Sequence, residues 1–151
     1  GRKLIMGGVD IPHTRGLLGH SDADVLAHAV ADALLGGVRG GDIGKLFPDT
    51  DPAYEGADSM KLLAAVAGFV RDRGYEILDV DSVIAAQAPK LSPYREQMRE
   101  NLARAMGISP ENVGIWALKA AKRAFRLRRW LFSFDVRIEF AIILLEQRGL
   151  L

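Results

Sequence analysis

Cysteine is absent from this chain of 151 residues. The sequence can therefore form no disulfide, offers no thiolate to a metal ion and contains no cysteine nucleophile, and we expect a cytoplasmic location. Histidine is scarce as well, with three residues, so few imidazoles can serve as metal ligands. No apolar run approaches the roughly 18 residues that a membrane-spanning helix needs, which predicts that the chain has no membrane partner.

The remaining composition is that of a globular domain. Hydrophobic residues make up 49% of the chain and charged residues 26%, which is ordinary usage for a folded protein. The length suits a single domain over residues 1–151. The sequence begins with Gly1 rather than methionine, which leaves open whether residues upstream have been removed.

Apolar periodicity and turn residues divide the chain into alternating strands and helices. Strands that alternate with helices predict an α/β (α+β) fold in which helices cover one face of a sheet. The expected elements are a short strand at 3–9 with a turn-rich loop at 10–16, a helix at 22–36, a long loop at 40–58, a helix capped by Asp58 or Ser59 that ends before Gly74, a strand at 76–88, and a helix capped by Ser92 that ends at Gly107.

The last part of the chain has a different character, because 115–148 contains neither glycine nor proline. Within 130–140 every second residue from Trp130 to Phe140 is apolar, and most residues between them are polar or charged, which predicts a long half-buried strand. Strong helix formers fill 117–129, so a helix there and a strand continuing from 112–118 are both open. Six basic residues and no acidic one lie in 119–129. Such a run could bind nucleic acid, but it more often forms a solvated face, so nucleic acid is not an expected partner.

The stretch HSDADVLAH (20–28) holds two of the three histidines. Asp24 and His28 are four residues apart on the predicted helix, which places them on one face, close enough to share a metal ion. His20 and Ser21 precede the helix, where backbone N–H groups favour an anion such as phosphate. The alternative is an aspartate that caps the helix, with one solvent-facing and one core histidine. A catalytic zinc site needs three protein ligands, and the third histidine of the chain, His13, lies elsewhere.

The loop GDIGKLFPDTDP (41–52) gathers carboxylates around a lysine and a phenylalanine. Carboxylates on such a loop can bind the hydroxyls of a polyol or coordinate a hard cation through oxygen. Aspartates that form turns before proline are the alternative.

Five segments in this order resemble the family of 2-C-methyl-D-erythritol 2,4-cyclodiphosphate synthases: GGVDIPH (7–13), GLLGHSDADVLAHAVADALLG (16–36), GDIGKLFPDTDP (41–52), GADS (56–59) and AQAPKL (86–91). The resemblance extends from about Gly1 to Gly114, lapses, and returns at AIILLEQ (141–147). It implies a lyase of non-mevalonate isoprenoid biosynthesis. It also implies a homotrimer with mixed sheets around the threefold axis and active sites between neighbouring subunits.

The family's reaction cyclises a cytidine-diphosphate-linked methylerythritol phosphate: the 2-phosphate attacks the β-phosphate and cytidine monophosphate leaves. The resemblance implies zinc as a Lewis acid and magnesium or manganese as a second cation. Carried over by motif, His28 is a zinc ligand, with Asp24 as a possible helper. The remaining implied site residues are His20, Ser21 and Asp42 for catalysis, and Gly44, Phe47, Asp49, Asp51, Ala86, Gln87, Ala88, Pro89 and Lys90 for substrate binding.

Two features differ from the family pattern. The family opens with a strand ending in an Asp-x-His pair that supplies two zinc ligands, and this chain begins after it. A Thr-Thr-x-Glu-type segment then contacts the nucleotide phosphates, where this chain has Leu118, Lys119 and Ala121. We therefore expect impaired or lost activity. The alternative is a catalytically silent, engineered trimeric scaffold for self-assembly. In that case 115–140 contacts a protein partner or takes the place of the missing strand at the sheet edge.

Overall fold

The computed structural model describes residues 4–12, 24–41, 46, 58–86, 89–119 and 136–147, with the backbone alone at 85–86, 118–119 and 136–147. The elements in these ranges form a short hairpin, three helices, two short 3₁₀ turns and a sheet. In chain order they are β1 (Leu4–Met6), β2 (Val9–Ile11), α1 (Val25–Gly37), α3 (Ser59–Asp72), β3 (Tyr75–Ala86), η2 (Ser92–Tyr94), α4 (Arg95–Met106), η3 (Pro110–Asn112), β4 (Val113–Lys119) and β5 (Val136–Gln147).

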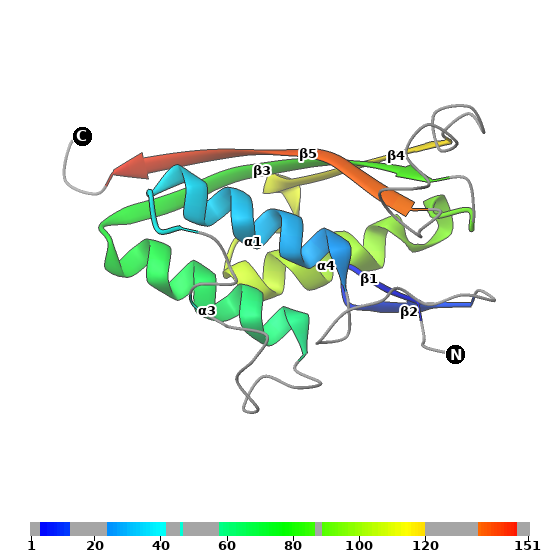
Figure 1. Cartoon of the computed structure of the whole chain (residues 1–151), viewed down its shortest axis with the longest axis horizontal. Coiled ribbons are helices and arrows are strands. Elements are labelled where there is room, and N and C mark those ends of the chain that lie inside the picture. Colours follow the sequence, from blue (N-terminus) through cyan, green and yellow to red (C-terminus); the bar gives the residue numbers. More distant parts are fainter. Residues whose placement is uncertain are drawn as a thin grey trace.

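The sheet is mixed, and its described strands lie in the order β4-β3-β5. β3 and β4 are parallel, whereas β3 and β5 are antiparallel. The three helices lie on one side of this sheet, and the β1–β2 hairpin lies below one end of it (Figure 1). The expectation of an α/β fold with helices on one sheet face is confirmed.

The core lies between the helices and the sheet. α1, α3 and α4 each direct an apolar stripe inward, as their periodicity predicts, and alternate residues of β3 face them from the sheet. The fully buried members of this layer include Leu26, Val30, Leu34, Leu63, Val66, Val70, Met98, Leu102, Met106, Val80 and Ile84.

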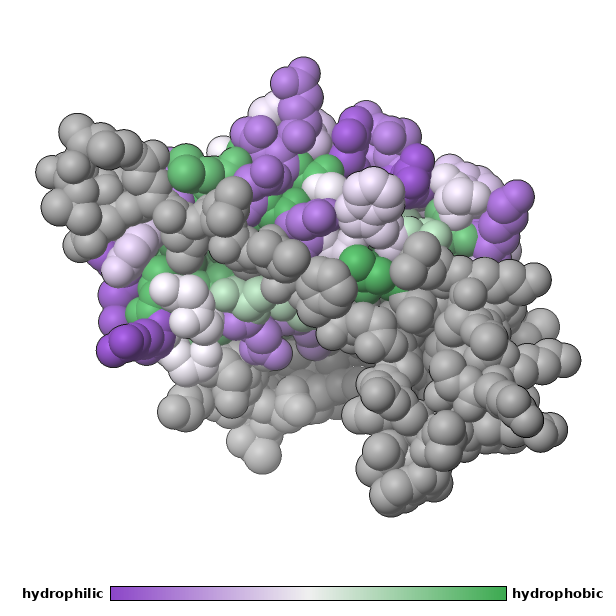
Figure 2. Space-filling model, turned by 90° about the horizontal axis from the view of Figure 1, so that it is seen from above, coloured by the Kyte–Doolittle hydropathy of each residue, from purple (hydrophilic) through white to green (hydrophobic). Residues whose placement is uncertain are grey.

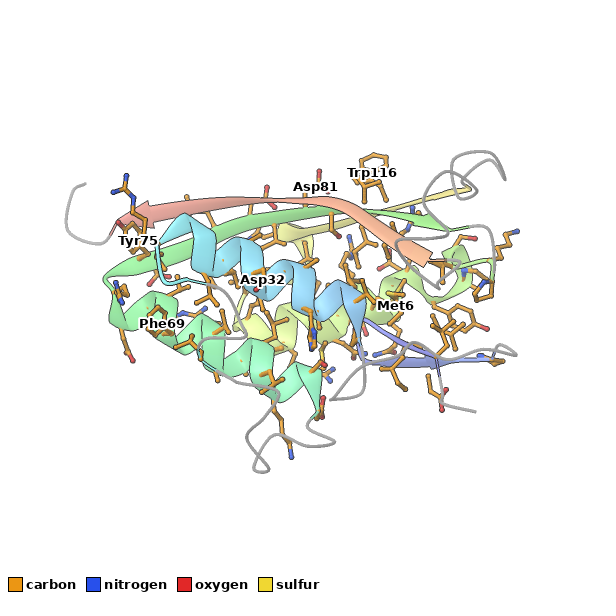
Figure 3. All side chains as sticks on the ribbon, in the orientation of Figure 1. Met6, Asp32, Phe69, Tyr75, Asp81 and Trp116 are labelled. Carbon is orange, nitrogen blue, oxygen red and sulfur yellow. The ribbon has the colours of Figure 1, made fainter. Side chains whose placement is uncertain are left out.

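The other face of the sheet carries exposed apolar side chains. Leu78 on β3 is 43% exposed and Trp116 on β4 is 58% exposed. Trp116 and Asp81 project away from the helices (Figure 3). Seen from this side, apolar patches lie between polar groups on the described surface (Figure 2). No element among the described residues covers these two side chains.

The prediction of one strand over 3–9 is wrong, because the chain reverses direction after Met6 and forms two short strands. β1 and β2 pair in an antiparallel hairpin with Met6 opposite Val9. Gly7 and Gly8, at the turn, have φ of 55° and 73°, and positive φ at both central positions is the geometry of a type I′ turn. Asp10 and Ile11, expected in a loop, therefore belong to β2.

The ends of the helices follow the predicted capping chemistry with two changes. Asp58 rather than Ser59 caps α3, and Asp24 caps α1, which begins three residues later than expected. Ser92 is not a cap: it starts the 3₁₀ turn η2, and α4 begins at Arg95. Gly107 ends α4 with φ of 70°, as a left-handed C-terminal glycine should.

Both strands after α4 are present in the described ranges. For 117–119 the strand alternative is confirmed, because β4 continues to Lys119. The strand expected at 130–140 is confirmed from Val136 and extends further, to Gln147; residues 120–135 lie outside the described part. Across the described residues, no helix has the length and apolar character needed to cross a membrane.

Candidate functional site

His28 lies one turn into α1, beside the first turn of α3. Its Nε2 atom is 3.0 Å from the Oγ atom of Ser59, the first residue of α3. The imidazole is half-buried, and Ser59 is 1% exposed. The two helices pack against each other. The contact between His28 and Ser59 therefore lies at the interface of α1 and α3.

Asp24 organises the start of α1 and is fully buried, with 0% exposure. Its Oδ1 atom accepts hydrogen bonds from the backbone N–H groups of Gly7 at 2.9 Å and Ala27 at 3.0 Å, and Oδ2 accepts one from Gly8 at 2.7 Å. The capping alternative is therefore confirmed for Asp24. Because both carboxylate oxygens are bonded to backbone N–H groups, we do not propose Asp24 as a helper ligand for a metal ion.

The donor set decides how far a zinc site can be built from these residues. The second ring nitrogen of a histidine ligand is usually hydrogen-bonded to an outer partner. His28 can supply one imidazole to such a site, and its Nε2 atom contacts the Ser59 hydroxyl group. In the described ranges, however, no group of three or more His, Cys, Asp or Glu side chains could hold a metal ion. We therefore derive no catalytic step through zinc.

The ends of β3 and β4 bring a second pair of predicted site segments together. In the parallel register, Ala85 lies opposite Leu118 and Ala86 opposite Lys119. Pro89 and Lys90 follow the end of β3, and Lys90 is exposed. The segment expected to bind cytidine thus starts beside the segment expected to meet the nucleotide phosphates, because the carboxyl ends of parallel strands lie at the same sheet edge.

The other predicted site residues lie outside the described part of the chain, and their roles stay predictions. Leu46, in the range expected to form a loop, is helical in the structure and packs against the hydrophobic core. The predicted residues outside the described ranges are His20, Ser21, Asp42, Gly44, Phe47, Asp49, Asp51, Gln87 and Ala88.

Sequence reasoning gave Ser59 no role at the site. It belongs to the GADS segment (56–59), where a serine beside an aspartate at a helix start indicates capping. Its contact with His28 crosses 31 residues of sequence, and no local pattern predicts which helix turns will face each other.

Comparison with known proteins identifies relatives over most of the chain. The YgbB family model matches residues 1–128. The 2-C-methyl-D-erythritol 2,4-cyclodiphosphate synthase of Trichlorobacter lovleyi is 61% identical over 116 residues, which cover 77% of this chain and 74% of the relative. The enzyme of the same name from Geotalea uraniireducens is 50% identical over 147 residues, covering 97% of this chain and 90% of the relative. The likeness therefore continues past Gly114, further than expected.

Solved structures share the fold. A 2C-methyl-D-erythritol-2,4-cyclodiphosphate synthase in its CDP-bound form superposes with a TM-score of 0.83 at 35% identity, covering 97% of this chain and 91% of that one. A CDP complex of the corresponding protein from Plasmodium falciparum has a TM-score of 0.78 at 27% identity, covering 98% and 86%.

Proposed function

Because the chain belongs to the YgbB family, whose relatives are the 2-C-methyl-D-erythritol 2,4-cyclodiphosphate synthases of non-mevalonate isoprenoid biosynthesis, we propose that it binds the cytidine-diphosphate-linked substrate of that reaction. We further propose that it releases cytidine monophosphate at a reduced rate. The register of β3 and β4 carries this proposal. It supports a nucleotide pocket at the strand ends, and a related structure is a CDP-bound form.

In this proposal, the pocket is formed by 86–90 and by the end of β4. Lys90 is exposed beside the strand ends, and a lysine ammonium group there can neutralise phosphate charge. Leu118 and Lys119 stand where the family has polar threonines. Fewer hydroxyl donors to the diphosphate lower the stabilisation of charge that develops as the phosphorus–oxygen bond breaks, which is the reason for the reduced rate.

His28 is the proposed zinc ligand. A bound zinc ion would supply Lewis-acid chemistry at the reacting phosphate, and magnesium or manganese would supply positive charge at the diphosphate. His20 and Ser21 are proposed beside the substrate phosphate, and Asp42, Gly44, Phe47, Asp49 and Asp51 around the methylerythritol group, as the family motif implies. Among the described residues, Ser59 contacts the imidazole of His28 where α1 packs against α3.

We also propose that the protein assembles as a trimer through the sheet face opposite the helices. The exposure of Trp116 and Leu78 on that face supports this assembly, because large apolar side chains on an uncovered sheet face are typical of contact surfaces.

The function is tested on the full chain with zinc and magnesium supplied. We expect the chain to bind CDP in calorimetry and to release cytidine monophosphate from the family substrate. His28→Ala should lower the release at least 10-fold while CDP binding persists, because the imidazole is at α1 and the nucleotide segments are at the sheet edge. Absence of both CDP binding and product release would refute the proposal.

A catalytically silent trimeric scaffold is the second candidate. It is favoured because apolar Leu118 and basic Lys119 stand in place of the family's threonines, which contact the nucleotide phosphates. Its signature in the same experiment is a stable trimer that binds no zinc and turns over no substrate. Stoichiometric zinc with turnover would exclude it.

A further inference from the structure

Asp81 places a carboxylate on the sheet face that points away from the helices. Its side chain projects from this face together with that of Trp116 (Figure 3), and Asp81 is half-buried. In the parallel register, Asp81 lies opposite Gly114 and Val83 lies opposite Trp116. Since every second residue of a strand shares a face, the carboxylate and the indole are neighbours on adjacent strands.

The position of this carboxylate is set by the pairing of the two strands. Its Oδ1 atom accepts a hydrogen bond from the Ser82 N–H group at 3.1 Å. A Cβ atom at Gly114 would lie 2.5 Å from the same oxygen, so the carboxylate can lie against β4 only because residue 114 has no side chain. The charge is therefore held close to the sheet surface instead of extending into solvent.

The described sheet supplies no cation next to this carboxylate. Its two basic residues, Lys119 and Arg137, stand opposite Ala86 and Ala85, at least four residues, or about 13 Å, along β3 from Asp81. Because a charge that is buried without a partner is strongly unfavourable, assembly through this face requires a donor from another molecule.

A second copy of the chain has the charge that this face lacks. A bulge between Ile77 and Asp79 leaves Leu78 and Asp79 both exposed, which adds a second carboxylate to β3. The run 119–129, by contrast, holds six basic residues and no acidic one. In a ring of three subunits, one surface of each copy meets a different surface of the next, so an acidic and apolar face can meet a basic one.

We propose that Asp81 is the polar anchor of the contact between subunits, where its carboxylate accepts a hydrogen bond from a lysine or arginine of the neighbouring copy. This rests on the trimer of the proposed function. Trp116 and Leu78 supply the apolar area of the contact, and the charge pair fixes how the two copies are oriented, because charge complementarity determines register more than area does.

The full chain tests this by sedimentation velocity over a range of protein and sodium chloride concentrations. Asp81→Asn removes the charge, keeps the shape and can still accept from the Ser82 N–H group. We expect the protein concentration at which half the chain is trimeric to rise at least about 10-fold, and assembly to become less sensitive to salt, which screens charge pairs.

Asp72→Asn is the matched control. Asp72 is an exposed residue at the end of α3, so this variant makes the same change in net charge on the helix side of the molecule. We expect it to assemble like the wild-type chain at every salt concentration. Equal weakening in both variants would overturn the proposal, because the effect would then come from net charge.

The remaining outcomes separate the anchor from the proposed function. If Asp81→Asn assembles like the wild-type chain, the anchor is refuted while the trimer stands. If the wild-type chain stays monomeric, the anchor and the trimer are both refuted. If Asp81→Asn alone weakens assembly, but the wild-type chain neither binds CDP nor releases cytidine monophosphate, the anchor stands and the proposed reaction fails.

Discussion

At the scale of single residues, Asp24 is a buried side chain whose loss should lower the stability of the fold substantially. Its carboxylate accepts hydrogen bonds from the backbone N–H groups of Gly7, Gly8 and Ala27. Asp24→Ala leaves these donors without that acceptor in a buried place, and unsatisfied buried donors are costly. We expect the free energy of unfolding to fall by about 3 kcal/mol, measured by urea denaturation.

Asp58→Ala is the matched control for this change. Asp58 also caps a helix, but it is exposed and its carboxylate accepts from the Met60 N–H group, at 2.8 Å. A cap of this kind contributes about 1 kcal/mol. Equal losses for the two variants would contradict the view that Asp24 also holds the hairpin.

At the scale of elements, the β1–β2 turn is packed too tightly for a side chain at Gly7. A Cβ atom there would lie 2.7 Å from the Cβ atom of Met98, and the residue has φ of +55°. Gly7→Ala should lower the free energy of unfolding by about 2–4 kcal/mol, combining left-handed strain with overpacking, measured by thermal denaturation.

Gly74 separates the two causes. Its φ is +88°, but in the described part of the chain no atom beyond its two sequence neighbours would lie within 4 Å of a Cβ atom at this position. Gly74→Ala should therefore show the left-handed strain alone, about 1 kcal/mol. If Gly7→Ala is no more destabilising than Gly74→Ala, the close approach of Met98 is not a constraint.

The three helices and the sheet could be predicted from sequence because their signals are local. Apolar spacing in α1, α3 and α4 identifies buried stripes, and Gly107 marks a helix end. The hairpin at 4–11 was missed because two glycines within an apolar run do not by themselves show that the chain reverses. Likewise His28 was identified by its motif, whereas the partners of Asp24 and the contact with Ser59 depend on how distant segments pack.

At the scale of the whole molecule, the uncovered sheet face should control assembly. Trp116→Glu places a charge on the face that we propose to be buried between subunits, where an unpaired charge is strongly unfavourable. We expect sedimentation velocity to show a monomer in place of a trimer. Ala64→Glu introduces the same charge at an exposed position of α3, on the helix side, and should leave the trimer intact; dissociation in both variants would contradict the assignment of the interface.

The hydrogen bond from the Asn101 side chain to the Gly7 carbonyl oxygen spans 94 residues of sequence. A two-stranded hairpin has little stability alone, and this one is held at its turn by Asp24 on α1 and Asn101 on α4. During synthesis, β1 and β2 emerge well before α4. The hydrogen bond from Asn101 to the turn of the hairpin can therefore form only after α4 has been made. Contacts of such long sequence separation form slowly, so we expect β1 and β2 to become ordered late in folding. The start of α1, which Asp24 joins to the hairpin turn, then becomes fixed at the same stage.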